Sequence, residues 1–285
     1  NLHSLTIQQE TINFKSIKNS FLINLPHRAD RLENFRQKYV EANINIPLYI
    51  HSAVNGKKLK LEDINITRLA KKEITDAQTL GYRTKHYQLT MGGIGCYLSH
   101  VGLWNLIYNK GIDYALIFED DANIPPDFIK NLNISIKNMN KADPNWDILF
   151  LDALCRDCIP YQDNIVKINK FFQTHAYIIQ RKAIKKMLDH HMLFPINQQI
   201  DAALGSHSNI LRLYTVTNGF VKLGDFSTDI QIGIKKQEGI NPNDDAPSKK
   251  AGLLAGDIIY SFNGSKNKQL RVRVPKHVHC RCVAD

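Results

Sequence analysis

Short apolar runs alternate with amphipathic stretches over the first 234 residues of the chain. The runs are rich in Ile, Leu and Phe, as expected of strands buried in a sheet, and the stretches repeat apolar residues near the helical period of 3.6. We predict strands at 20–25, 48–53, 114–118, 146–151 and 176–179, and helices at 28–42, 64–72, 94–108, 125–139 and 182–190. Strands that alternate with helices predict an α/β fold, with a mostly parallel sheet flanked by helices on both faces.

Three consecutive acids, Glu119, Asp120 and Asp121, follow directly after the predicted strand 114–118. In open α/β sheets, ligands bind at the carboxyl ends of strands, and like charges this close together require a cation or several hydrogen-bond donors. Two carboxylates at this spacing can bind a hard divalent cation whose other ligands are the oxygens of a diphosphate. The alternative is that Asp120 or Asp121 only caps the next turn.

The net charge of +10 divides the chain into two parts. Residues 1–234 hold 27 Lys and Arg against 22 Asp and Glu, whereas residues 235–285 hold ten against five, so the 51-residue tail supplies half of the net charge. The basic residues of the tail are scattered and have few aromatic neighbours, which favours a solvated face over a nucleic-acid site. We therefore predict a first domain at 1–234, a basic tail at 235–285, and no specific nucleic-acid partner.

The five cysteines and the distribution of apolar residues are the sequence evidence on the cellular compartment. Cys155 and Cys158 have the spacing of a redox or metal pair, and the tail residues His277, His279, Cys280 and Cys282 are candidates to complete a zinc site; reduced, bridged and metal-bound states stay open. No apolar run is long enough to span a bilayer, and the first thirty residues lack a secretory profile. We expect a cytoplasmic protein, with an endomembrane lumen open because the sequence starts at Asn1.

One block of sequence resembles a known family. Residues 95–124, "GCYLSHVGLWNLIYNKGIDYALIFEDDANI", are similar to the signature of glycosyltransferase family 25, in which a Cys-x-x-Ser-His helix precedes an apolar strand and Glu-Asp-Asp. Three further blocks resemble family segments in the family's order: "FLINLPHRADRLENF" (21–35), "THAYIIQRKAIKKMLD" (174–189) and "PINQQIDAAL" (195–204). The family includes bacterial lipooligosaccharide galactosyltransferases and collagen galactosyltransferases.

This resemblance implies a GT-A-like fold and an inverting hexosyltransferase. The implied donor is a UDP-sugar, usually UDP-galactose or UDP-glucose, and the implied acceptor is a hydroxyl of a glycan, a glycolipid or a collagen-like hydroxylysine. The alternative is a non-catalytic carbohydrate-binding or scaffold protein on the same fold.

The resemblance also assigns roles to the acids. Glu119 and Asp121 are the predicted ligands of a divalent metal, Mn²⁺ by preference, which offsets the charge of the leaving UDP, and Asp120 orients sugar hydroxyls or the metal's ligand shell. Asp201 is the predicted general base, and its alternative role is to cap the helix that follows it. Candidates for a third metal ligand are His207, Asp225, Ser227 and Asp229.

The donor is expected to lie against two elements. Asn24, Arg28 and Arg31 fall in the first strand-to-helix turn, where an Arg fork suits phosphate and Asn suits uracil or ribose. The alternative for Arg31 is surface pairing with nearby acids. Ser99 and His100 match the family's Ser-His pair and are predicted near the donor, although a helical His is often only a packing residue. In the tail, "SKKAGLLAGDIIYSFNG" (248–264) resembles part of a PDZ domain.

Overall fold

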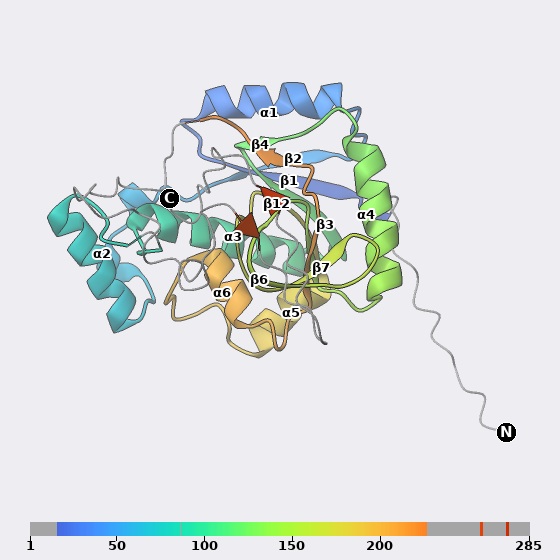
Figure 1. Cartoon of the computed structure of the whole chain (residues 1–285). Coiled ribbons are helices and arrows are strands. Elements are labelled where there is room, and N and C mark those ends of the chain that lie inside the picture. The colour runs from blue at the N-terminus through green and yellow to red at the C-terminus, as the bar shows by residue number, and fades with distance from the viewer. Residues whose placement is uncertain (1–15, 86, 227–256, 259–271, 274–285) are drawn as a thin grey trace.

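A central eight-stranded sheet forms the frame of the protein (Figure 1). The structure is a computed structural model that describes residues 16–85 and 87–226, together with the residue pairs 257–258 and 272–273. The strands are β1 (Asn19–Asn24), β2 (Leu48–Ser52), β3 (Tyr114–Glu119), β5 (Ile148–Phe150), β6 (Leu154–Pro160), β7 (Ile165–Phe172), β8 (Ala176–Gln180) and β9 (Leu213–Val216). Their order across the sheet is β2-β1-β3-β8-β5-β9-β7-β6.

The sheet is mixed in its pairings but mostly parallel in direction. β1 pairs in parallel with β2 and β3, and β5 with β9, whereas the pairs that involve β7 or β8 are antiparallel. Following these pairings across the sheet, only β7 and β8 run against the other six strands. The predicted α/β class with a mostly parallel sheet is confirmed.

Helices cover both faces of the sheet, as predicted (Figure 1). They are α1 (Ala29–Glu41), α2 (Arg68–Leu80), α3 (Met91–Asn109), α4 (Phe128–Ala142), α5 (Arg181–Asp189) and α6 (Ile200–Ser206), with short 3-10 turns η2 (Gly56–Lys58) and η3 (Leu61–Asp63). Side chains of β1 alternate between two cores: Phe21 and Ile23 pack with α3, and Leu22 packs with α1 and α4. Strands buried on both faces explain why the sequence shows continuous apolar runs.

Several boundaries differ from the predictions. The predicted helix 64–72 is α2, which begins at Arg68 because Thr67 caps it, and which ends before Gly81, a residue in the left-handed conformation. The predicted strand 146–151 shortens to β5. The sequence pattern missed β6, β7 and β9 altogether, and the helix expected to follow Asp201 is α6, which begins at Ile200. Strands β6 and β7 carry polar residues on one face, which weakens the apolar signal of a strand.

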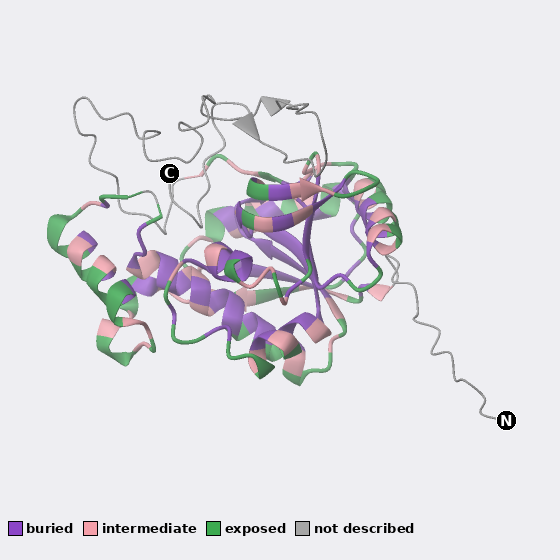
Figure 2. Cartoon of the chain, turned by 60° about the horizontal axis from the view of Figure 1, so that its bottom comes forward, coloured by how far each residue is buried: buried purple, intermediate pink, exposed green. Residues whose placement is uncertain are grey.

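The outer elements show where the molecule is exposed. Figure 2 shows a buried sheet and a largely exposed α2. None of the helices in the described part of the chain has the length and apolar character to cross a membrane. Two short ribbons lie outside the main sheet: β4 (Ala122–Asn123) pairs with β10 (Lys222–Leu223), and β11 (Asp257–Ile258) pairs with β12 (Val272–Arg273).

The cysteine pair of β6 is bridged. Cys155 and Cys158 form a disulfide, so the structure selects the bridged state among the three that their spacing left open. Of the PDZ-like segment 248–264, only Asp257–Ile258 (β11) is described, and His277, His279, Cys280 and Cys282 lie outside the described residues.

Candidate active site

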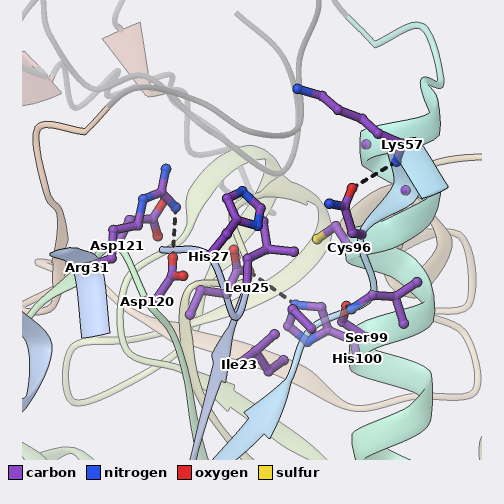
Figure 3. A pocket seen from close by; sticks show the side chains of 16 residues that line it. Ile23, Leu25, His27, Arg31, Lys57, Cys96, Ser99, His100, Asp120 and Asp121 are labelled. Carbon is purple, nitrogen blue, oxygen red and sulfur yellow. Dashed lines mark hydrogen bonds and ion pairs between the residues drawn. The ribbon is translucent and has the colours of Figure 1, made fainter. Parts of the chain in front are cut away.

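The three acids lie at the carboxyl end of β3, where the sequence places them, and all are buried. β1 pairs in parallel with β3, with Ile23 opposite Glu119, so Asn24 lies next to Asp120. The Asn24 amide donates to Asp120 Oδ2 (2.8 Å), and Arg31 Nη1 of α1 donates to Asp120 Oδ1 (2.7 Å). Three predicted site residues from two distant blocks of sequence are thus in direct contact, and Figure 3 shows Arg31 and Asp120 among them. The alternative for Arg31, surface pairing with nearby acids, is wrong: its partners Asp120 and Asp121 are buried and distant in sequence.

Glu119 turns toward α3 instead. Its Oε1 accepts a hydrogen bond from Thr174 Oγ1 (2.8 Å) and lies 3.1 Å from Nε2 of His100. The other ring nitrogen of His100 lies 2.8 Å from the Tyr177 hydroxyl, which also accepts from Trp104 Nε1. Burial opposes protonation of His100, but Tyr177, Cys96 and Glu119 outweigh it and raise its pKa well above the usual value. A buried network therefore holds the Glu119 carboxylate in one orientation.

Asp121 is the least satisfied of the three acids. It is 2% exposed, and its Oδ1 has no hydrogen-bond partner among the described residues. Its Oδ2 lies 3.7 Å from Arg31 Nη1. Burial, followed by the charge of Glu119, raises the pKa of Asp121 to about 6. An ionised Asp121 therefore needs additional positive charge.

A pocket opens beside these acids between the ends of β1 and β3 and the helix α3 (Figure 3). Its wall includes Ile23, Leu25, His27, Arg31, Asn55, Lys57, Gly92, Cys96, Ser99, His100 and the three acids. A Cβ on Gly56 would lie 1.8 Å from Met91 O, and one on Gly95 would lie 2.5 Å from Val54 O. Glycine at both positions lets the loop after β2 pack directly on the backbone of α3.

Ser99 and Arg28 have structural contacts. Ser99 Oγ donates to Gly95 O (2.6 Å) and accepts from Val54 N (2.8 Å), which ties the loop to α3 at the pocket wall. The Arg28 guanidinium pairs with Asp30 in the first turn of α1. Ser99 thus lines the predicted donor pocket, whereas donor binding by Arg28 stays a prediction.

Two sets of residues could hold a metal ion, and they share Glu119. The predicted set is Glu119 with Asp121, which offers oxygen ligands. The second set was not predicted: Cys96, His100 and Glu119 present ligand atoms within 4.8 Å of one another. Oxygen ligands suit hard ions such as Mg²⁺ and Mn²⁺, and a thiolate with an imidazole suits Zn²⁺. Because Asp121 has an oxygen without a partner in the described part of the chain, the donor atoms of the predicted set fit a hard divalent ion.

Asp201 lies behind Glu119, in the first turn of α6. The helix begins at Ile200 and its N-cap is Gln199, so the alternative role of Asp201 as the N-cap is wrong. Asp201 is fully buried and accepts hydrogen bonds from the backbone N–H groups of Gln173 (3.2 Å) and Ala202 (2.7 Å). Burial raises its pKa to about 7, and the charge of Glu119 adds to the effect. It does not line the pocket in the form described.

The candidates for a third metal ligand are spread along the later chain. His207 lies at the far end of α6, where its Nδ1 is 2.8 Å from Ala203 O. Asp225 is exposed and follows Gly224, whose N–H donates to Asp121 O (2.7 Å), so the late loop does return to the acids. Ser227 and Asp229 lie outside the described residues.

Sequence reasoning missed the residues that support the acids from the second half of the sheet. Thr174 and Tyr177 bind Glu119 and His100, and His175 Nε2 lies 2.7 Å from Val221 O. Gln173 and Gln199 flank Asp201. Thr174, His175 and Tyr177 belong to a block that the family resemblance covers, but nothing in their types or spacing points to Glu119.

Comparisons with known proteins point to one family. The family model "Glycosyltransferase family 25 (LPS biosynthesis protein)" matches residues 17–203, about two thirds of the chain. Procollagen galactosyltransferase 1-A of Xenopus laevis is 27% identical over 214 residues, which are 71% of this chain and 34% of that protein. Human procollagen galactosyltransferase 2 is 25% identical over 66% of this chain and 30% of its own length. The chain thus spans about a third of the length of these relatives.

The similarity to solved structures is weaker. Mannose-1-phosphate geranyltransferase from Thermus thermophilus aligns with 72% of this chain and 75% of its own, with a TM-score of 0.39 and 10% identity.

Proposed function

The chain belongs to glycosyltransferase family 25, and from that premise we propose that it transfers galactose or glucose from a UDP-sugar to a hydroxyl group, with inversion at the anomeric carbon. The proposed acceptor is a glycan, a glycolipid or a collagen-like hydroxylysine, the last suggested by the names of the relatives. The observation that carries the proposal is the buried acid cluster at the carboxyl end of β3, in which Asp121 Oδ1 lacks a partner among the described residues and an open pocket lies alongside.

We propose that Glu119 and Asp121 hold a divalent ion, Mn²⁺ by preference. Three carboxylates lie at this strand end, the Arg31 guanidinium pairs with two of them, and burial leaves the charged form of Asp121 unfavourable. A divalent ion restores the balance of charge, and it supplies electrostatic stabilisation of the leaving diphosphate. Arg31 and Asn24 fix Asp120 so that it can face the ligand, and the cationic side chains of Arg31 and Lys57 line the same pocket.

Asp201 is the proposed general base. A base is most effective when its pKa is near the working pH, and the pKa of Asp201 is raised to about 7. Gln173, whose backbone N–H donates to Asp201, is followed by Thr174, whose hydroxyl donates to Glu119, so two adjacent residues link the proposed base to the acid cluster. Asp201 does not line the pocket in the form described, so base catalysis requires the acceptor hydroxyl to reach it from the pocket.

A screen of UDP-sugars tests this function. We expect the protein with Mn²⁺ to hydrolyse UDP-galactose or UDP-glucose slowly, and to transfer the hexose faster when a hydroxyl acceptor is added. Excess EDTA should stop both reactions. A folded protein that binds a UDP-hexose but never consumes it would instead support a non-catalytic carbohydrate-binding role, and full activity in EDTA would remove the metal from the proposal.

A further inference from the structure

Two buried glutamines beside Asp201 have side-chain atoms without hydrogen-bond partners in the described part of the chain. Gln173 and Gln199 are each 2% exposed. Gln173 Nε2 and both polar atoms of the Gln199 amide make no hydrogen bond to any described residue. A buried polar group without a partner is costly, and most buried groups in folded proteins have one. Three such atoms in two glutamines near Asp201 indicate that a ligand or water completes the site.

The two glutamines lie close to the proposed base, and Gln173 is also next in sequence to a residue that contacts the proposed metal site. Gln173 donates its backbone N–H to Asp201, and Thr174, the next residue, donates to Glu119. Gln199 precedes Asp201 by two residues and is the N-cap residue of α6. Its Oε1 lies 3.6 Å from the position that a Cβ on Gly93 would take, and Gly92, the preceding residue, lines the pocket. The Gln199 amide therefore lies next to the first turn of α3, which carries the pocket residue Gly92, although neither glutamine lines the pocket in the form described.

The backbone of Gln173 adds an independent observation. Its φ of +86° is in a region that residues other than glycine rarely adopt. Strained conformations of this kind persist where the surrounding structure imposes them, and they are concentrated at ligand and active sites. The strained residue is the one that supplies a hydrogen bond to Asp201 and an amide nitrogen with no described partner.

We propose that the side-chain amides of Gln173 and Gln199 bind hydroxyl groups of the transferred hexose and so determine which hexose the protein accepts. The inference rests on the proposed function, because the transferred sugar must lie between the leaving diphosphate and the base. A sugar hydroxyl both donates and accepts hydrogen bonds, and so does a carboxamide, so the chemistry of the two groups matches. Because the amides are buried and do not line the pocket in the form described, the hexose contacts them only if the pocket extends toward Asp201 on binding.

The competing explanation is an internal water molecule. Buried waters commonly satisfy such groups, and they do so without any role in substrate choice. The two explanations differ in what happens when the amide is removed: a water site affects only stability, whereas a sugar site affects binding of UDP-hexose relative to binding of UDP.

Calorimetric titration of the full chain with UDP, UDP-galactose and UDP-glucose, each with Mn²⁺, tests the inference. Gln199→Met keeps the length of the side chain and removes both polar atoms. We expect the preferred UDP-hexose to bind about tenfold more weakly to this variant, while the affinity for UDP changes by less than about twofold. Gln173→Met should show the same pattern. Deoxy analogues of the preferred donor identify the hydroxyl: the analogue that has lost it should bind wild type weakly and Gln199→Met no worse.

Gln198→Met is the matched control. Gln198 is the neighbouring glutamine, and its Nε2 already donates to Ala202 O and Ser206 Oγ. We expect this variant to bind UDP and both UDP-hexoses like wild type. Should Gln199→Met fail to fold, Gln173→Met carries the test by itself, with the same control.

Three outcomes would overturn the inference. Unchanged affinity of both glutamine variants for UDP-hexose indicates an internal water, and an equal loss for UDP and UDP-hexose indicates a structural or nucleotide-binding role. If wild type binds UDP no less tightly than either UDP-hexose and consumes neither, the proposed function itself fails, and the inference fails with it. Only this third outcome is seen in wild-type protein, so the two failures are distinguishable.

Discussion

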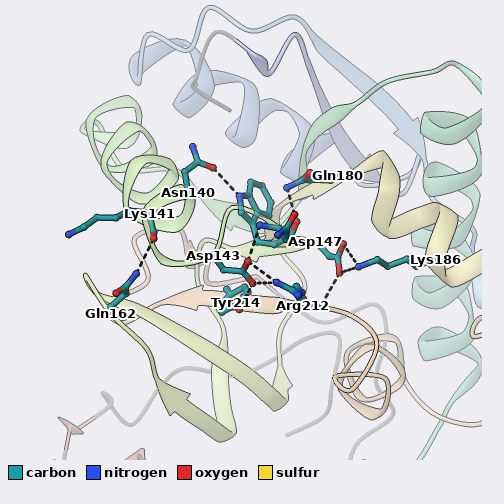
Figure 4. Close-up of polar contacts among 11 residues, drawn as sticks. Asn140, Lys141, Asp143, Asp147, Gln162, Gln180, Lys186, Arg212 and Tyr214 are labelled. Carbon is teal, nitrogen blue, oxygen red and sulfur yellow. Dashed lines mark hydrogen bonds and ion pairs between the residues drawn. The ribbon is translucent and has the colours of Figure 1, made fainter. Parts of the chain in front are cut away.

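Two clusters of charged and polar residues around buried acids lie at opposite ends of the strands of the central sheet. We call the end where the six parallel strands begin the amino edge and the end where they finish the carboxyl edge, and the two clusters differ in how many of their buried polar atoms have hydrogen-bond partners. At the amino edge, Asp147 accepts from Lys186 Nζ (2.7 Å) and from Arg212 N (2.8 Å), and Asp143 accepts from Arg212 Nη1 and the Tyr214 hydroxyl (Figure 4). Within the described part of the chain, each buried polar atom of these five side chains has a partner. At the carboxyl edge, Asp121, Gln173 and Gln199 all have buried atoms with no described partner.

The presence or absence of hydrogen-bond partners distinguishes polar groups with a structural role from those expected to bind a ligand. A satisfied buried network stabilises one arrangement of the chain, and removing a member leaves its partners without hydrogen bonds. A network with unpartnered atoms is less stable than it could be, which is expected where a ligand supplies the missing contacts. The amino-edge cluster links α5 to the sheet, and the proposed ligand would supply the contacts that are missing at the carboxyl edge.

Replacing one acid at each edge should separate the two roles most clearly. Asp121→Asn removes a carboxylate whose charged form is already unfavourable, so we expect a folded protein of similar stability whose turnover falls by about a thousandfold or more. Asp147→Asn removes the partner of Lys186, and we expect a loss of about 2–3 kcal/mol in the free energy of unfolding.

Urea denaturation and the rate of donor hydrolysis, both measured on Asp121→Asn and Asp147→Asn, test these two expectations. The donor hydrolysis of folded Asp147→Asn should stay within a few-fold of wild type. An Asp121→Asn protein that unfolds, or one that turns over normally, would contradict the contrast between the two edges.

Asp201→Asn should have the next largest effect. The amide keeps an acceptor oxygen for the N–H of Gln173 or Ala202 but cannot take up a proton. We expect the rate of transfer to fall by about 10² to 10⁴ while the affinity for the UDP-sugar stays nearly constant. Calorimetry and single-turnover kinetics on the same preparation measure both quantities. Unchanged transfer would limit Asp201 to a structural role.

The response to pH should be smaller and opposite in sign at the two edges. Asp201 has a folded pKa of about 7, above its ordinary value of 3.8, so the folded protein binds more protons than the unfolded chain between about pH 4 and 7. Stability from this group therefore rises as the pH falls through that window. Burial raises the pKa of Asp143, but the contacts from Tyr214, Asn145 and Arg212 outweigh burial and lower it. The stability that the ionised Asp143 carboxylate contributes is therefore lost only as the pH falls through this lowered pKa.

Urea denaturation at pH 5.5 and at pH 7.5, without metal, tests the predicted effect of Asp201 on stability. The free energy of unfolding should be greater at pH 5.5 by about 1–2 kcal/mol, and the difference should shrink in Asp201→Asn. A wild-type protein that is more stable at pH 7.5 than at pH 5.5 would contradict the raised pKa of Asp201.

Part of the site could be read from residue order alone. Glu119, Asp120 and Asp121 follow a buried strand, and a strand-to-helix connection fixes Asn24 and Arg31 within one turn of the sheet edge. Both facts depend on short stretches of sequence. Because α/β sheets bind ligands at the ends of their strands, these residues are expected to form the site. The pairing of Arg31 with Asp120 follows once β1 and β3 are neighbours.

The direction of each side chain could not be read in this way. Arg28 and Arg31 have the same chemistry three positions apart, yet one pairs with Asp30 and the other with Asp120. Asp201 has the sequence context of an N-cap, but α6 begins one residue before it. These outcomes depend on which way an element faces the sheet, and that is settled by packing across the whole core.

The sequence by itself determined the class of fold, the position of the acids at a strand end and the family, because each depends on residues close together in the chain. Only the tertiary structure decided the partners of those acids. Thr174, Tyr177, Gln173 and Gln199 reach the site from β8, from the turn before it and from the start of α6, and the hydrogen bonds of the first three span 28 to 77 residues. Their places depend on the antiparallel insertion of β8 between β3 and β5, which buries their polar atoms beside Glu119 and Asp201. No local pattern encodes that pairing, because strand order is set by the total burial of both faces of the sheet.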